Sequence, residues 1–248
     1  MLSGSNSGTP LVDFIAKGIL MSDEFNVFAW SMAIPLCDDL WLGMKARNIA
    51  IIDQGYLRPL ELEVLQEMGR NDTVPLHLSM ALGGLSEMWV FYLYEFLRTW
   101  RKKAEQIIKL ADQYERTKPA KRTKLNAANV VAAKGKEKFT QGAISSHSED
   151  IARIGDPTFV KTVKDYYNSI EGLFSCAEAL RVTLAKHEKS GGLIAESPGY
   201  ARLNMMVGSH YWHFVNKEGG LERLDRRELA NMFLGIDEDI EMSGDGRD

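Results

Sequence analysis

A repeat of apolar side chains with a period of 3.5 residues constrains this chain more than any other feature. Between Phe159 and His187, the repeating positions follow one another at alternating steps of four and three residues. The members of the repeat are Phe159, Val163, Tyr166, Ile170, Leu173, Ala177, Leu180, Leu184 and His187. A seam of this period suits a long helix that lies along another helix and buries one narrow stripe. The repeat predicts how the protein is built, but it does not indicate what the protein does.

A second apolar stripe predicts the helix against which this seam packs. From Leu85 to Tyr114 the large apolar residues share one face of a helix, which Lys118-Pro119 ends. Near its start, Gly83 and Gly84 each cost about 1 kcal/mol of helix stability relative to alanine. The glycine pair therefore predicts a kink or a close approach of another element. We expect helices over 85–115 and 158–188 to lie side by side.

Shorter helices are predicted before these two. One runs from near Asp23 to Pro35, a second runs from residue 36 to a break at Gln54-Gly55, and a third starts at Pro59. The apolar residues assigned to the first two are Phe25, Phe28, Ala29, Met32, Leu36, Leu40, Trp41, Met44 and Ile51. Asp38 and Asp39 are adjacent carboxylates that a helix points in different directions, so they do not predict a paired-carboxylate site.

After residue 191 the apolar residues alternate, which predicts strands. Gly208-Ser209 lies between two alternating runs and predicts a two-residue type II′ turn. In that register Met205 faces Trp212, and His210 packs inside. A helix over the same residues remains the alternative, because their apolar positions also fit a period of 3.6.

The end of the chain predicts a third strand and a last helix. The third strand would cover residues 221–224, after the turn at 218–220. Asp225 and Glu228 have the spacing of a capping box, and Gly235 provides a helix stop.

We therefore predict a mainly α protein: an irregular helical bundle built on two long helices, with a small C-terminal antiparallel β-meander. The predicted regions are a flexible leader over 1–22, a helical bundle over 23–190 with a basic crossover loop at 116–150, a meander with a short helix over 191–235, and an acidic disordered tail over 236–248.

Composition excludes several classes of protein. An apolar fraction of 45% and a charged fraction of 26% are typical of soluble globular proteins. The strongest apolar run, 88–97, is interrupted by Glu95 and is too short to span a bilayer, so no membrane partner is expected. Cys37 and Cys176 are too few and too far apart for a disulfide framework or a zinc site, which favours reduced thiols and a cytoplasmic protein.

The sequence gives little support for cofactor chemistry. His210 and His213 have no cysteine or acidic residue at metal-ligand spacing, so we expect no metal site. The sequence contains neither a phosphate-binding glycine loop nor a Gly-x-Ser-x-Gly nucleophile elbow. We therefore expect no cofactor.

A basic segment separates the two predicted long helices. Residues 116–138 contain eight basic residues and one acid, a net charge of +7 in a chain whose total is −4. The basic residues are Arg116, Lys118, Lys121, Arg122, Lys124, Lys134, Lys136 and Lys138. The segment has two interpretations: a solvated linker, with at most a short helix over 125–133, or an arm that binds RNA or DNA through phosphate contacts. Because aromatic residues are not interleaved, base stacking is not indicated.

One short motif suggests catalysis. Arg70, Asn71 and His77 follow the pattern Arg-polar-(five residues)-His. This spacing resembles the Arg-x(4–6)-His signature of HEPN-type helical domains, many of which are metal-independent ribonucleases. The resemblance implies that Arg70 steadies a phosphate and His77 assists proton transfer at a 2′-hydroxyl, with both residues meeting across a dimer. It covers about eight residues, and Pro75 within the motif departs from the family pattern.

The preferred hypothesis is a non-catalytic helical interaction or regulatory protein that self-associates through its helices and contacts nucleic acid, if at all, through the basic segment. The alternative hypothesis is the HEPN-like ribonuclease that uses Arg70 and His77.

Overall fold

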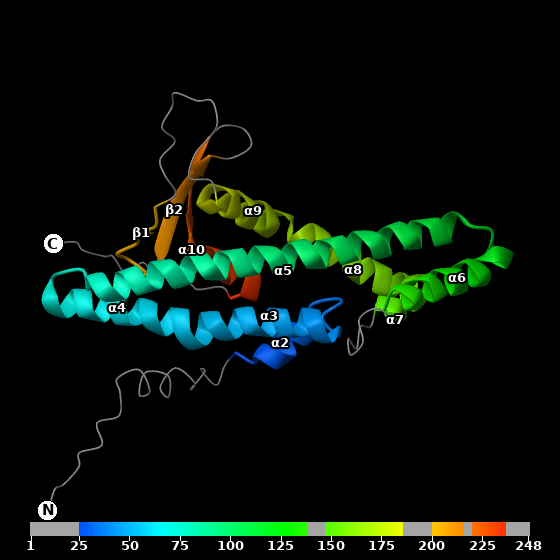
Figure 1. Ribbon diagram of the computed structural model, residues 1–248, viewed down its shortest axis with the longest axis horizontal. Helices are drawn as coiled ribbons and strands as arrows, with labels where there is room; N and C mark the ends of the chain where they lie inside the picture. The colour runs from blue at the N-terminus through cyan, green and yellow to red at the C-terminus, as the bar shows by residue number, and fades with distance from the viewer. Residues whose placement is uncertain (1–24, 138–146, 186–199, 216–219, 237–248) are drawn as a thin grey trace, which may run out of the picture.

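The computed structural model describes residues 25–137, 147–185, 200–215 and 220–236. It is mainly α-helical with a small antiparallel sheet near the C-terminus (Figure 1), which confirms the predicted fold class. The predicted leader over 1–22 and His187 at the end of the heptad seam lie outside the described residues, and so does the acidic tail apart from Ile236.

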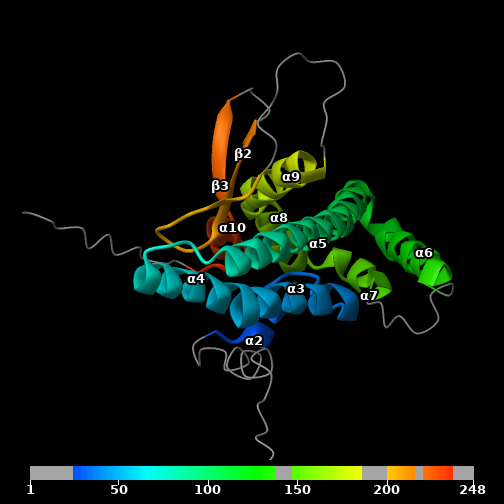
Figure 2. The ribbon, with the colours of Figure 1, turned by 60° about the vertical axis from the view of Figure 1, so that its left-hand side comes forward.

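Two long helical rods form an antiparallel hairpin along the molecule (Figure 2). The hairpin consists of α3 (Leu40–Ile52), η1 (Asp53–Leu57) and α4 (Arg58–Asn71), followed by α5 (Leu76–Arg116). Indole N–H groups of α5 fix the register of the two rods. Trp89 Nε1 donates to the carbonyl oxygen of Ile49 at 3.1 Å, and Trp100 Nε1 donates to that of Pro35 at 2.6 Å.

The first rod contains a π-helical turn where the sequence predicts a break. The predicted end of a helix at Gln54-Gly55 is wrong, because the backbone continues through η1 into α4. A π turn adds one residue to the helix without ending it. Pro59 fits the start of α4 because an early helical position needs no backbone N–H donor.

The heptad seam packs against α5, as predicted, but it is divided between two helices. α8 (Pro157–Ser169) and α9 (Glu171–Ala185) meet at Ile170, whose ψ of 7° departs from helical geometry. Ser169 Oγ donates to the carbonyl oxygen of Tyr166, and this local bond competes with regular helix formation. Both helices contact α5, and the seam remains buried on either side of the bend.

The basic segment is helical rather than a loop. α6 (Pro119–Glu137) extends well beyond the short helix expected over 125–133, and it folds back from the end of α5 to pack on α7 (His147–Ala152). A short 3-10 turn, η2 (Arg153–Gly155), then leads into α8. At the other end of the described chain, α2 (Val27–Ala33) packs on α3.

The C-terminal unit is a meander followed by a helix, as predicted. The sheet order is β1 (Arg202–Leu203), β2 (His210–Val215) and β3 (Leu221–Asp225), and α10 (Arg226–Leu234) follows. Asp225 and Glu228 form the predicted capping box, and Gly235 ends α10 in the left-handed conformation. The capping box ties the last strand directly to the first turn of the helix.

The predicted hairpin register is wrong. Leu203 pairs with His210, so residues 204–209 form a longer connection than a two-residue turn, and Met205 is exposed instead of facing Trp212. The physical reason is that Asn204 Nδ2 donates to the Asp225 carboxylate at 2.8 Å, while Ser209 Oγ bonds to the same group. His210 is buried, as expected, and lies against Gly83 of α5. The close approach predicted from the glycine pair is thus to a strand.

Gly208 and Gly235 provide a matched test of this packing. Both have positive φ (72° and 66°), so alanine at either position carries a similar backbone cost of about 1 kcal/mol. A Cβ at Gly208 would also overlap the carbonyl oxygen of Glu61, whereas a Cβ at Gly235 would meet open space. Urea unfolding should therefore show a larger loss of unfolding free energy for Gly208→Ala than for Gly235→Ala. Equal losses would contradict the packing of residues 204–209 on α4.

Candidate functional site

The outer side of the helical hairpin is the leading candidate for a functional surface. Trp41, Met44 and Ile51 lie at helical spacing along α3, and Leu85 and Met88 lie along the neighbouring side of α5; all five are exposed. We call these five residues the hairpin face.

A polar contact joins the two halves of the hairpin face. Asn48 shares a side of α3 with Met44 and Ile51, and Tyr92 lies one turn beyond Met88 on α5. Asn48 Nδ2 donates to the hydroxyl of Tyr92 at 3.5 Å, so the two apolar stripes lie next to each other. The interpretation of Trp41, Met44 and Ile51 as the apolar side of a packed helix is wrong, because Leu42, Ala46 and Ile49 occupy the core side of α3 instead.

Behind the hairpin, four buried charges tie the C-terminal unit to the first rod. Asp53 and Glu61 come from the first rod, and Arg226 and Arg227 come from the first turn of α10; none is more than 3% exposed. Each guanidinium bonds to both carboxylates. The longer bonds include Arg226 Nε to Glu61 at 2.8 Å and Arg227 Nη2 to Asp53 at 2.7 Å.

The π turn explains why two acids eight positions apart converge. In a regular α-helix, eight residues rotate a side chain about 80° beyond two full turns. The wider π turn removes roughly that excess, so Asp53 and Glu61 share one side of the rod. Burial alone would raise the pKa of Asp53, but Arg226 and Arg227 lower it below its ordinary value. The four groups neutralise one another and form a structural clamp.

The sequence analysis did not find this clamp. One signal was available: Arg226 and Arg227 directly follow the N-cap Asp225, although the helix dipole disfavours cations at a helix N-terminus. Two arginines there predict acidic partners, but their identity depends on contacts across more than 160 positions.

A second buried charge group joins the other end of the hairpin to α7. The Lys103 ammonium lies 2.9 Å from Asp39 and 2.8 Å from Asp150. Asp38 instead points outward to Arg153, so the adjacent carboxylates diverge, as predicted. Burial raises the pKa of the nearby Cys37 thiol to about 12, so this cysteine is not activated as a nucleophile.

The residues of the HEPN-like motif lie where the two rods meet. Arg70 and Asn71 end α4, and both bond to Glu67, at 2.9 and 2.8 Å. His77 is exposed in the first turn of α5. Within the described residues, no hydrogen bond or ion pair links His77 to Arg70 or Asn71, and a catalytic pair here stays a prediction.

The residues of the basic segment divide into two groups. Lys121, Lys124 and Lys134 are exposed along α6, and Arg116 and Lys118 are exposed where α5 ends. Arg122 differs from these because its guanidinium donates to backbone carbonyl groups of Glu115 and Thr117 and lies over Tyr114. Lys136 belongs to α6, and Lys138 lies outside the described residues. The helix therefore presents a set of lysines to solvent, whereas Arg122 stabilises the turn.

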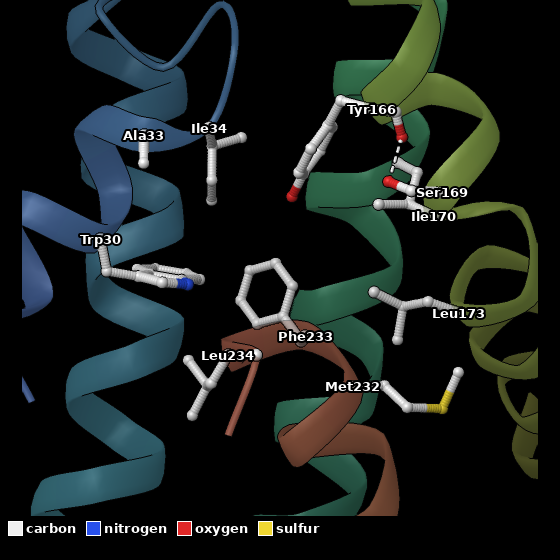
Figure 3. Close-up of a pocket in the computed structure, with 11 residues that line it drawn as sticks. Trp30, Ala33, Ile34, Tyr166, Ser169, Ile170, Leu173, Met232, Phe233 and Leu234 are labelled. Carbon is white, nitrogen blue, oxygen red and sulfur yellow. Dashed lines mark hydrogen bonds between the residues drawn. The ribbon is translucent and has the colours of Figure 1, made fainter. Parts of the chain in front are cut away.

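An apolar pocket of about 510 Å³ opens between α2, α8, α9 and α10 (Figure 3). Its walls include Trp30, Leu173 and Phe233, and the indole of Trp30 meets the ring of Phe233 edge-on at 5.0 Å. Tyr166 also lines it and packs edge-on against Trp100 at 4.9 Å. This pocket shares no residue with the hairpin face.

Neither the described residues nor sequence comparison identifies a class for this chain. In the described ranges, no helix is both long and apolar enough to cross a membrane, and no group of three or more histidine, cysteine, aspartate or glutamate residues could hold a metal ion. Comparisons with family models, with curated proteins and with solved structures gave no match.

Removing one cation from the clamp should strongly destabilise the protein. Arg226→Met leaves two buried carboxylates with only Arg227, and we expect the free energy of unfolding to fall by about 3–5 kcal/mol. The control is Arg223→Met on β3, where an exposed guanidinium lies over the Tyr211 ring and contributes only about 0.5–1 kcal/mol. Urea unfolding measures both changes. An Arg226→Met variant as stable as the control would contradict the role of the clamp.

Proposed function

We propose that this protein is a non-catalytic helical interaction protein that functions as a homo-oligomer, with the hairpin face as its self-association surface. The observation that carries the proposal is the exposure of large apolar side chains on a rigid helical pair. Trp41 is 54% exposed and Met88 is 69% exposed. Contiguous exposed apolar side chains mark interaction sites in soluble proteins, and tryptophan is enriched among the residues that dominate binding energy.

A second copy of the chain suits this surface. A two-fold interface brings the same residues of both copies together, so a charged face would repel its copy. The hairpin face is apolar, and at its edge the charges of Glu95 and Arg98 neutralise each other in an ion pair. Two antiparallel hairpins packed on these sides would complete a four-helix bundle.

The size of the surface is also appropriate. The stretch of the first rod from Trp41 to Tyr56 is about 22 Å long at 1.5 Å per residue, and two neighbouring helices are about 20 Å wide. Such a footprint is of the same order as the roughly 800 Å² that each partner buries in a standard interface.

Sedimentation velocity tests self-association. The double variant Met44→Glu/Met88→Glu places two charges on the hairpin face, and we expect it to sediment as a monomer under conditions in which the unmodified protein is a dimer or larger. Both residues are exposed, so the fold should tolerate the changes. The matched control, Val131→Glu/Leu221→Glu, adds the same charge at exposed apolar positions of α6 and β3 and should leave the oligomer intact. A monomeric unmodified protein, or equal dissociation of both double variants, would contradict the proposal.

Nucleic-acid binding through α6 is a second candidate function. The observation that favours it is that Lys121, Lys124 and Lys134 are exposed on one regular helix that carries no acid before Glu137. Lysines held in this way can contact successive phosphates and release counterions.

Fluorescence anisotropy with generic labelled RNA and DNA tests this candidate. Lys121→Glu/Lys124→Glu/Lys134→Glu should weaken binding and make it less dependent on salt, with roughly one unit of the log–log salt slope lost per lysine contact. The control Lys102→Glu/Lys109→Glu/Lys161→Glu changes the net charge by the same amount at exposed lysines outside α6. Equal binding by the two triple variants would dismiss the candidate.

A further inference from the structure

Within the apolar pocket, the Tyr166 hydroxyl is the feature that suggests a ligand. Figure 3 shows this hydroxyl directed from α8 into the space between Ile34 and Phe233. It makes no hydrogen bond with any of the described residues. A hydroxyl removed from bulk water without a partner is costly, so the site favours an occupant that supplies an acceptor.

The chemistry of the walls limits what that occupant can be. No ionised side chain lines the pocket, and its aromatic and aliphatic walls include Trp30, Leu173 and Phe233. A charged molecule would lose its hydration without gaining an opposite charge, which excludes anions and cations as preferred ligands. Burial, with a smaller contribution from Cys37, raises the pKa of Tyr166 above its ordinary value, so the phenol stays protonated and can donate.

The volume favours a small molecule over a protein element. About 510 Å³ lies within the roughly 300–1,000 Å³ typical of small-ligand sites, which are mostly apolar with a few well-placed polar groups. An α-helix with its side chains is about 10 Å wide and would not fit. The packing of Tyr166 on Trp100, itself fixed by its bond to Pro35, holds the hydroxyl in one place.

We propose that this pocket binds a neutral, largely apolar small molecule whose carbonyl oxygen accepts a hydrogen bond from the Tyr166 hydroxyl. The aromatic walls of Trp30 and Phe233 enclose the apolar part of the ligand. The proposal is independent of self-association, because the pocket and the hairpin face have no residue in common.

The probe for this site is prodan, a neutral naphthalene ketone whose fluorescence responds both to apolar surroundings and to hydrogen bonding at its carbonyl. Titration of the full-length protein should show saturable binding of one probe per chain. Tyr166→Phe keeps the ring on Trp100 but removes the donor. It should weaken binding about fivefold, as expected for one hydrogen bond of about 1 kcal/mol, and shift the bound emission to shorter wavelength.

Two further variants complete the test. Leu173→Trp fills the pocket and should abolish the saturable signal, with circular dichroism used to verify folding because Leu173 is buried. Tyr92→Phe removes a tyrosine hydroxyl next to the hairpin face and should bind prodan like the unmodified protein. Non-saturable binding, binding that survives in folded Leu173→Trp, or equal affinity and emission for Tyr166→Phe and the unmodified protein would each overturn the proposal. The Tyr166→Phe comparison decides the matter alone if Leu173→Trp does not fold.

Discussion

The need to bury one side of α5 determines the arrangement of the other elements. Trp89, Leu93, Phe96 and Trp100 point to the same side of this helix, and all are at most 1% exposed. α3 covers one flank of that side through the indole bonds, and α8, α9 and the β2 strand cover the rest. Because all the partners of α5 gather there, the outer side of the hairpin is left uncovered. The exposed apolar residues on that outer side are therefore a consequence of how the core is built.

Electrostatics positions the C-terminal unit more tightly than apolar contacts alone would. Buried ion pairs are costly to desolvate and contribute little net stability, but removing one partner is severely destabilising. The clamp of Asp53, Glu61, Arg226 and Arg227 therefore specifies one docking geometry, since any shift of α10 along the rod would leave a charge unpaired. The same docking places Phe233 beside Trp30 and forms one wall of the pocket. In this way the clamp on one side of α10 determines the shape of the ligand site on the other.

Sequence reasoning succeeded where a local pattern determines the structure and failed where distant groups decide it. The stripe of α5 and the capping box at Asp225 were predictable, because helical spacing and neighbouring side chains are sufficient for both. The register of the meander was not, because Asp225 bonds to Asn204 and Ser209 and lengthens the connection. The clamp and the face of α3 were missed for a similar reason: both sides of α3 carry apolar residues, and only its packing on α5 decides which side is buried. The candidate surface is therefore a property of the tertiary fold.

Double electron–electron resonance gives the most direct test of the claim that the hairpin face packs against its own copy. A nitroxide at Thr99→Cys lies on the exposed flank of α5 beside this face, in a Cys176→Ala background in which the remaining Cys37 is buried and unreactive. We predict a dipolar signal between two copies that increases with protein concentration, disappears on dilution with unlabelled protein, and is absent when Met44 and Met88 are replaced by glutamate. A signal that is absent at every concentration, or that persists unchanged in the glutamate variant, would contradict the account.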